Sequence, residues 1–360
     1  MRTLQSTGPL PLRVLRRALV GLSLLSSLTA CGEEEESGGA VNSVGATLSD
    51  QGALAKSDDT AETDAAAPCE GEGEGGGAGP LRPLNLQNDS DNLYAWRKTR
   101  ASLDPEQEVV FYWVGYIYEL TRANPGNYPR PGAPTFESPL FRFEGFNVAR
   151  FAEVSPGSYE MLSREVSVYQ DPNSGEILDC WRSPLIPGRP SLRVLHVAND
   201  PVNFGVGPVS FVELGERVSF FSDVLLAYRS PLAGGYDDFS ASDVYQSNEL
   251  FNFYVDRISL EDESVLSAPV EISWSRVGQY LPWMQMGSEE GQLIYHVRGY
   301  KVLDGVEGLP QELLDWTRTV AGERFLHAPE EIPASYQPNA TTWRVFKETL
   351  DSGAYTPSCD

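Results

Sequence analysis

The chain has 360 residues and is acidic, with 51 Asp and Glu against 27 Lys and Arg and a formal net charge of −24. A charge of this sign makes nucleic acids and anionic membrane surfaces poor partners. The sequence contains no P-loop, no dinucleotide fingerprint, no nucleophile elbow, no HExxH and no CxxC. We therefore expect no bound cofactor and no metal site.

Residues 1–30 have the pattern of a lipoprotein signal peptide. Four arginines accompany an apolar run at 18–28, which is too short to cross a hydrocarbon core of roughly 30 Å at about 1.5 Å per residue. The run ends Leu28-Thr29-Ala30-Cys31, which resembles the bacterial lipobox. The resemblance implies cleavage before Cys31 and a lipid on its sulfur that anchors the chain to a membrane of the cell envelope. Gly32, in place of aspartate, resembles the pattern of outer-membrane delivery. The alternative is an ordinary signal peptide in which Cys31 is a chance residue.

Residues 31–79 are predicted to form a disordered acidic tether. Residues 32–79 hold twelve acidic residues and one basic residue, Lys56, and the last part is nearly all glycine and glutamate. Such a segment cannot bury enough apolar area to offset the entropy lost on ordering. The tether would hold the body, 80–360, clear of the bilayer, or it is simply an inert solvated tail. We expect the body to be a single β-rich domain.

Three cysteines besides Cys31 are present, and an exported location permits disulfides. An odd number allows at most one bridge among Cys69, Cys180 and Cys359. We prefer Cys180 with Cys359, because this bridge would fix the C-terminus to the body, whereas Cys69 lies in the tether. Reduced thiols are the alternative.

The body alternates apolar, aromatic and polar residues in a way that predicts mainly strands. Helices are expected near 89–103, 309–320 and 341–350, from capping residues and apolar side chains at offsets of three and four. Between them, runs rich in Val, Ile, Phe, Tyr and Trp predict strands at 109–120, 140–149, 159–170, 192–197, 217–228, 250–258, 270–277 and 292–302. The segment 171–175 predicts a hairpin turn.

No long helix separates these strands, so we predict an antiparallel meander. Closing into a barrel or a half-barrel would remove or shorten its exposed edges. Along the second strand, Arg142 and Glu144 share one face and Phe141 and Phe143 the other. If the aromatic face packs outward, the polar face could line a cavity, and otherwise it is solvated.

Motifs throughout the body resemble the bacterial domain-of-unknown-function family numbered 1838. The residues that carry the resemblance are Arg100-Ala101-Ser102-Leu103-Asp104, Glu144-Gly145-Phe146-Asn147, Ser163-Arg164-Glu165, Tyr169, Asp171-Pro172, Gly175-Glu176, the segment 196–204, Trp274-Ser275-Arg276, Leu281-Pro282-Trp283-Met284, Met286-Gly287, His296, Gly299, Lys301 and Pro338-Asn339 with Trp343 and Phe346-Lys347. The chain departs from the pattern at its N-terminus and at Ala340-Thr341, where an acidic residue is expected. The resemblance implies a shared architecture and no established activity.

The segment 196–204 contains the richest set of reactive side chains. His196 can act as a general base or acid near neutral pH, and Asp200 could orient it if the chain curls back between them. Asn203 follows on the same segment and is a candidate ligand contact. The alternative is a loop whose polar side chains bond to their own backbone.

Further candidate ligand-binding residues stand on the predicted strands. A carboxylate and a guanidinium on neighbouring strands could bind a polar ligand group or form a structural ion pair. The residues in this group are Glu144, Asn147, Arg164, Arg276, His296 and Trp283.

The sequence is compatible with three functional hypotheses. The first is an anchored module that binds a small, largely apolar molecule in a β-barrel cavity. The second is a metal-free acid–base enzyme, a hydrolase, lyase or isomerase, with His196 as base, Asp200 as its orienting group and Arg164 or Arg276 meeting a developing anion. The third is an envelope interaction protein with a solid barrel.

The anchor predicts a simple fractionation result. Replacing Cys31 with serine removes the sulfur that would carry the lipid, so the Cys31→Ser chain should leave the membrane fraction. Cell fractionation followed by immunoblotting measures this directly, and continued membrane retention would contradict the lipid anchor.

Overall fold

The computed structural model describes residues 79–121, 139–184, 186, 188–240, 242–287, 289, 291–331 and 339–359. The predicted signal peptide and Cys31 lie outside the described residues, as does nearly all of the predicted tether, so these stay predictions.

The first helix, α1 (Asp89–Arg100), begins where the sequence offers a cap. The side chain of Asn88 accepts hydrogen bonds from the backbone N–H groups of Ser90, at 2.9 Å, and Asp91, at 3.4 Å. Acidic residues occupy the first turn and basic residues the last, which complements the helix dipole. The predicted helix at 89–103 is confirmed, and it ends three residues earlier than expected.

Ten strands form one antiparallel sheet in the order β6-β3-β2-β1-β12-β11-β10-β9-β8, with β7 also pairing with β3. Their bounds are β1 (Val109–Thr121), β2 (Phe141–Ser155), β3 (Ser158–Gln170), β6 (Val197–Asn199), β7 (Phe204–Val206), β8 (Phe211–Leu214), β9 (Arg217–Arg229), β10 (Val244–Asp256), β11 (Glu271–Gly278) and β12 (Gly291–Val302). A separate two-stranded sheet pairs β4 (Cys180–Trp181) with β5 (Leu192–Arg193). The predicted mainly β, antiparallel meander is therefore present.

The structure differs from the prediction mainly in the short elements. The strand expected at 192–197 is split into β5 and β6, and β10 begins earlier than expected and gives way to α2 (Arg257–Glu261). The strands β4, β7 and β8 were not predicted, because two to four residues are too few to show an alternating pattern. The turn after β3 is closed by a hydrogen bond from Gly175 N–H to the Asp171 carbonyl, at 2.9 Å.

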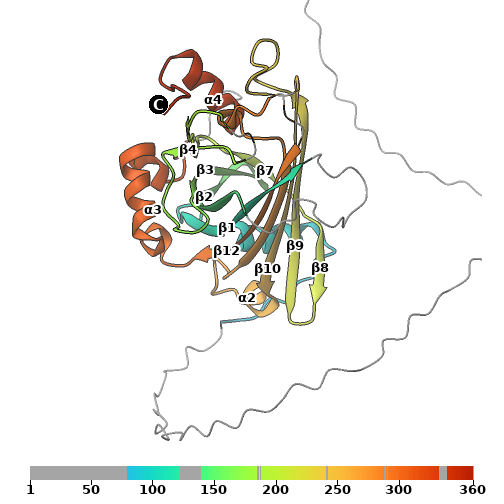
Figure 1. The fold of residues 1–360 in the computed structure, drawn as a ribbon. Coiled ribbons are helices and arrows are strands. Elements are labelled where there is room, and N and C mark those ends of the chain that lie inside the picture. Colours follow the sequence, from blue (N-terminus) through green and yellow to red (C-terminus); the bar gives the residue numbers. More distant parts are fainter. Residues whose placement is uncertain are drawn as a thin grey trace, which may run out of the picture. The chain divides into compact units, whose positions relative to one another are not determined.

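The sheet is open in the part of the chain that the structure describes. Its path ends at β6 on one side and β8 on the other, and no pairing joins these two strands. The prediction of a closed barrel is therefore not supported. Figure 1 shows that the sheet is nevertheless strongly curved, with long strands wrapping around a concave side.

The two faces of the sheet carry two separate hydrophobic cores. The core on the concave face includes Trp113 and Phe143, whereas the other core includes Phe146 and Val166 and lies under α3 (Gln311–Trp316). The 3-10 turn η2 (Gly305–Gly308) precedes α3, and the π-helical turn η3 (Thr317–Ala321) and the 3-10 turn η4 (Glu323–Leu326) follow it. The single helix predicted at 309–320 is thus two shorter elements. Figure 1 places α3 along the outside of the sheet.

The C-terminal helix α4 (Thr342–Asp351) buries Trp343 and Phe346 against the concave core. Thr341 caps it by accepting a hydrogen bond from Arg344 N–H at 3.4 Å. Beyond the helix, Cys359 forms a disulfide with Cys180, with the Cα atoms 6.3 Å apart. Of the helices in the described ranges, none has the length and apolar character needed to span a membrane.

The helices α1 and α4 cover the two ends of the concave face. Trp96 of α1 contacts Phe253 with ring centroids 5.0 Å apart, and Trp343 of α4 contacts Tyr245 at 4.8 Å. Both partners lie on β10, eight residues apart, which corresponds to roughly 26 Å along a strand. The concave face is therefore bounded at each end by a helix that brings its own tryptophan.

A buried lysine on β12 holds the end of α1 in place. The Lys301 amino group donates to the carbonyl oxygens of Lys98, at 2.8 Å, and Ala101, at 3.1 Å, and lies 3.2 Å from Oγ of Ser267. Burial, with a smaller effect from Arg100, lowers the pKa of Lys301 well below its usual range. The bonds satisfy carbonyl groups that the end of a helix would otherwise leave without partners.

Replacing this lysine should be costly. Lys301→Met keeps much of the side-chain volume but leaves buried carbonyl groups without donors, so the free energy of unfolding should fall by about 2–4 kcal/mol in urea titrations. Lys347→Met is a matched control, because Lys347 lies on the surface of α4 and contacts Asp351 within the same helix; it should change stability little. Equal losses for the two variants would contradict the role assigned to Lys301.

Candidate functional site

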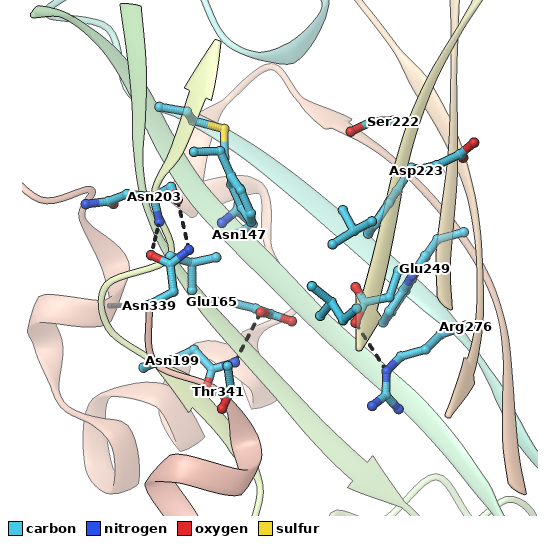
Figure 2. A pocket seen from close by; sticks show the side chains of 18 of the residues that line it. Asn147, Glu165, Asn199, Asn203, Ser222, Asp223, Glu249, Arg276, Asn339 and Thr341 are labelled. Atoms are coloured by element: carbon cyan, nitrogen blue, oxygen red, sulfur yellow. Dashed lines mark hydrogen bonds and ion pairs between the residues drawn. The ribbon is translucent and has the colours of Figure 1, made fainter. Parts of the chain in front are cut away.

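The concave face of the sheet encloses a cavity of about 1120 Å³. Side chains from β1, β2, β3, β9, β10, β11 and β12 line it, together with residues of α1 and α4 and of the segments around β6 and β7. Figure 2 shows that polar side chains enter this pocket from two opposite sides and leave an open centre.

Aromatic rings form much of the pocket wall. The rings of Phe251 and Trp274 stack with centroids 5.4 Å apart and planes 3° from parallel, and Trp113 meets Trp274 at 6.2 Å. Phe143 and Tyr295 meet edge to face at 5.3 Å. Rings packed against one another are rigid, so the wall is a preformed apolar surface suited to a flat or ring-bearing ligand.

One side of the pocket holds an ion pair between neighbouring strands. Nε of Arg276 on β11 donates to Oε1 of Glu249 on β10 at 3.2 Å. The guanidinium also lies 3.3 Å from the hydroxyl of Tyr245 and 4.8 Å from the centre of the Tyr295 ring. Burial raises the pKa of Glu249, and the guanidinium of Arg276 opposes this effect. Arg276 is charged at neutral pH, so the half-buried carboxyl group of Glu249 has a buried counter-ion beside it.

The end of α1 supplies a second guanidinium. Nη2 of Arg100 donates to Oδ1 of Asn147 at 2.8 Å, and Nδ2 of Asn147 donates to the backbone carbonyl of Arg164 at 2.9 Å. Nη1 of Arg100 is buried and has no hydrogen-bond partner among the described residues. Burial lowers the pKa of Arg100 to about 10, against an opposing effect of Glu165. The guanidinium of Arg100 therefore stays charged at neutral pH, and its Nη1 atom can still donate a hydrogen bond.

Glu165 projects from β3 into the middle of the pocket. Among the described residues its carboxylate accepts one hydrogen bond, from Nδ2 of Asn199 at 3.3 Å. Burial is the largest influence and raises the pKa of Glu165 to about 7; the nearby Glu249 raises it further, while Asn199, Arg276 and Arg100 lower it. In Figure 2 the carboxylates of Glu165 and Glu249 face each other across the open centre. A carboxyl group with this pKa can give or take a proton near neutral pH.

A pair of asparagines ties the rim of the pocket together. Asn203 N–H donates to Oδ1 of Asn339 at 2.7 Å, and Nδ2 of Asn339 donates to the Asn203 carbonyl at 2.8 Å, as Figure 2 shows. The side chain of Asn203 accepts from Ser163 N–H at 3.2 Å. These bonds fix the loop before β7 against the residues that lead into α4.

Residues 106–350 match the family described as Protein of unknown function (DUF1838). The match covers more than half of the chain. The chain belongs to this family. The matched segment contains Glu165, Glu249 and Arg276, whereas Arg100 lies just before it. No match was found among curated proteins. The resemblance read from the sequence is thus confirmed at the level of the family, and all the residues that line the pocket except Trp96 and Arg100 lie within the matched segment.

The structure does not bring His196 and Asp200 together. The ring of His196 is fixed by two backbone groups: Nδ1 accepts from Tyr169 N–H at 3.1 Å, and Nε2 lies 3.0 Å from the Leu178 carbonyl. Burial lowers the pKa of His196 to about 4, so the imidazole is neutral at pH 7. Asp200 instead contacts Arg164 at 2.8 Å and Arg324 at 3.0 Å. The geometry that the predicted base and its orienting group would need is absent from this part of the structure.

The predicted ligand-binding residues are divided between the two faces. Asn147, Asn203 and Arg276 line the pocket. Arg164 and Glu144 lie on the opposite face, where Glu144 accepts hydrogen bonds from Tyr112 at 2.5 Å, Gln170 at 2.8 Å and Arg142 at 3.0 Å. These contacts satisfy the carboxylate inside the fold. Of the two alternatives for the polar face of β2, the cavity lining is wrong, because the aromatic face lines the pocket.

Two further candidates lie away from the pocket lining. His296 is exposed, because its neighbour Tyr295 takes the inward position on β12. Trp283 is fully buried in η1 (Pro282–Met284), where it packs against Phe141 at 5.8 Å and Trp181 at 5.7 Å. Neither side chain is placed to contact a ligand in the cavity.

Sequence reasoning missed Glu165, Glu249, Arg100 and Asn199. Three of them stand in the segments that carry the family resemblance, and Glu165 is the neighbour of Arg164 on the opposite face of β3. The sequence does not separate the two faces of β3, because each carries a mixture of polar and apolar side chains. No motif marks Glu249. Among the described residues no group of three or more His, Cys, Asp or Glu is placed to hold a metal ion.

The raised pKa of Glu165 predicts a pH-dependent stability. Its pKa is about 7 in the folded protein, above the ordinary 4.5, so the folded state holds more protons between these values. The stabilising contribution is complete below about pH 4.5 and is lost as the pH rises to about 7. Glutamine does not titrate, so the Glu165→Gln variant does not lose stability in this way. As the pH rises from 5 to 8, the free energy of unfolding of the variant should therefore increase relative to that of the wild type by about 2 kcal/mol.

Urea titrations at several pH values measure this shift. Glu312→Gln, an exposed position on α3, controls for the loss of one carboxyl group. A constant difference between Glu165→Gln and the wild type across this range would contradict the assignment.

Proposed function

We propose that this chain is an envelope lipoprotein whose folded part binds a small, largely apolar molecule in the concave pocket. The observation that carries the proposal is the pocket itself, with a volume of about 1120 Å³ and a wall of packed aromatic rings around a few converging polar groups. Small-molecule sites in proteins typically have volumes of roughly 300–1,000 Å³ and this same mixture of surfaces.

The polar groups favour a ligand that is uncharged overall. The lining carries four carboxyl groups, of Glu160, Glu165, Asp223 and Glu249, and three guanidinium groups, of Arg100, Arg276 and Arg344, so its charges nearly balance. A ligand with a full charge would upset this balance in a poorly solvated site. A molecule with a hydrocarbon body and one or two polar atoms would place its body on the aromatic wall and its polar atoms near the charged groups.

The cellular address is part of the proposal and rests on the sequence pattern at Cys31. Two or more acyl chains give stable membrane attachment, since each buried CH₂ contributes about 0.8 kcal/mol. In the fractionation experiment, Cys69→Ser is the matched control, because it removes a cysteine outside the lipobox and should leave the protein with the membranes.

The two other hypotheses lack support in the form in which the sequence suggested them. A solid interior has no support, because the concave face holds a cavity. An acid–base enzyme based on His196 and Asp200 has no support either, since their side chains bond elsewhere. The pocket carboxylates Glu165 and Glu249, by contrast, are placed where acid–base chemistry could occur.

A bulky residue placed in the pocket should block binding. Val224 on β9 lies directly opposite Glu249 in the register and lines the cavity, whereas the next residue, Leu225, is 68% exposed on the other face. The probe is N-phenyl-1-naphthylamine, a neutral ring compound whose fluorescence rises in apolar surroundings. The full chain carrying Cys31→Ser avoids detergent. Val224→Trp should weaken saturable binding at least about tenfold, and Leu225→Trp should leave it unchanged.

Thermal melting of both variants tests whether they fold. Binding that is equal in the two variants, or no saturable binding by the parent chain, would contradict the proposed function.

A further inference from the structure

Two carboxylates reach the centre of the pocket from opposite sides of the curved sheet. Glu165 stands on β3 and Glu249 on β10, and four strands separate them along the sheet. Only the curvature of the sheet brings them to one space, and Figure 2 shows the two carboxylates turned toward each other. Two like charges facing each other in an apolar cavity repel, so one carboxyl group should ionise less readily than the other.

Their surroundings differ in the way that acid–base chemistry requires. Burial raises the pKa of Glu249 too, but Glu249 is paired directly with the guanidinium of Arg276 at 3.2 Å, which opposes this effect and favours the ionised form. Glu165 has no ion pair within salt-bridge distance among the described residues and accepts one bond from an uncharged amide, at 3.3 Å. Burial and the charge of Glu249 raise its pKa to about 7. One carboxylate is thus placed to accept a proton, and the other to hold one.

We propose that the pocket transfers protons within an apolar carbonyl compound, with Glu249 as the base and Glu165 as the acid. The inference rests on the proposed function, since the substrate must first occupy the pocket. The aromatic wall accepts the hydrocarbon body, and the polar centre lies where a carbonyl group and its neighbouring carbon would sit between the two carboxylates.

The step balances within the substrate and the two side chains. Glu249 removes a proton from the carbon next to the carbonyl group, and the electron pair of the broken C–H bond becomes the C=C bond of an enol. The π electrons of the carbonyl group take the proton of Glu165, which becomes a carboxylate. Once solvent has replaced the proton on Glu249, its return to the same carbon exchanges hydrogen, and its return to a conjugated carbon moves the double bond. In both cases the enol O–H gives its proton back to the Glu165 carboxylate as the carbonyl group re-forms. The step needs no oxidant, reductant or second substrate.

Arg100 is placed to assist this transfer as a positioning and charge-balancing residue. Its guanidinium interacts electrostatically with Glu165 and is held by Asn147 at 2.8 Å. When Glu165 gives up its proton, a nearby fixed positive charge stabilises the carboxylate that forms. The ion pair of Glu249 with Arg276 loosens as Glu249 becomes neutral, so positive charge is available on both sides of the enol.

Hydrogen exchange provides a test that needs no knowledge of the natural substrate. The probe is 2-tetralone, a bicyclic ketone, incubated in D₂O with the full chain carrying Cys31→Ser, and loss of its α-proton signals is followed by NMR. The parent protein should accelerate exchange above the buffer rate. Glu165→Gln and Glu249→Gln should each lower the protein-dependent rate at least about 100-fold. Glu312→Gln, outside the pocket, should leave the rate unchanged.

Two further readouts separate chemistry from binding. Displacement of N-phenyl-1-naphthylamine by 2-tetralone reports occupancy, and it should persist in both glutamine variants. The exchange rate of the parent chain should decline as the pH rises above about 7, where Glu165 loses its proton, and this decline should be absent from the residual rate of Glu165→Gln.

The outcomes are distinct. Displacement without exchange, or exchange that survives both substitutions, overturns the proton transfer and leaves the binding function standing. Failure of 2-tetralone to displace the bound dye overturns the carbonyl class. Failure of the dye itself to bind overturns the binding function.

Discussion

The Lys301 amino group holds the C-terminal end of α1 against the concave face, and the pocket depends on this contact. A helix end leaves carbonyl groups without partners, and here they are buried against β12 rather than facing water. Because Lys301 satisfies them, α1 can end inside the fold and place Arg100 directly beside the pocket. The same helix brings Trp96 onto Phe253 and covers one end of the cavity. Lys301 therefore supports both the helix that covers one end of the cavity and the position of Arg100, one of the charged groups that line it.

The alternation of side chains along each strand separates structural from candidate functional residues. On β3, Arg164 faces outward to Asp200, whereas Glu165 faces the pocket. On β2, Glu144 is satisfied by Tyr112 and Gln170 on the outer face, and Phe143 lines the cavity. Neighbouring residues therefore have opposite roles, since successive side chains of a strand point to opposite faces.

The sequence predicted most of the secondary structure because the long strands alternate clearly, and it predicted the pairing of Cys180 with Cys359. It could not predict which face turns inward. On β2 both faces carry large side chains, and the choice depends on α3 covering one face from more than a hundred residues away. The carboxylate pair was hidden for a similar reason, because Glu165 and Glu249 are brought together only by the curvature of the whole sheet. His196 was a candidate only because histidine is a common acid or base. Burial beside Tyr169 lowers its pKa to about 4, so it does not change its protonation state near neutral pH.

The position of Glu165 is hard to explain by stability. A carboxyl group inside an aromatic cavity loses hydration, and a single hydrogen bond from Asn199 does not replace it. Glu144 shows what a structural carboxylate looks like in this protein, with three side-chain donors around it. Glu249 shows a second solution, an ion pair with Arg276. Glu165 has neither arrangement, although an apolar residue of similar size would fill the same space at lower cost. The carboxyl group of Glu165 therefore has unfilled hydrogen-bonding capacity toward an open cavity, and a partner that enters the cavity is the simplest explanation for it.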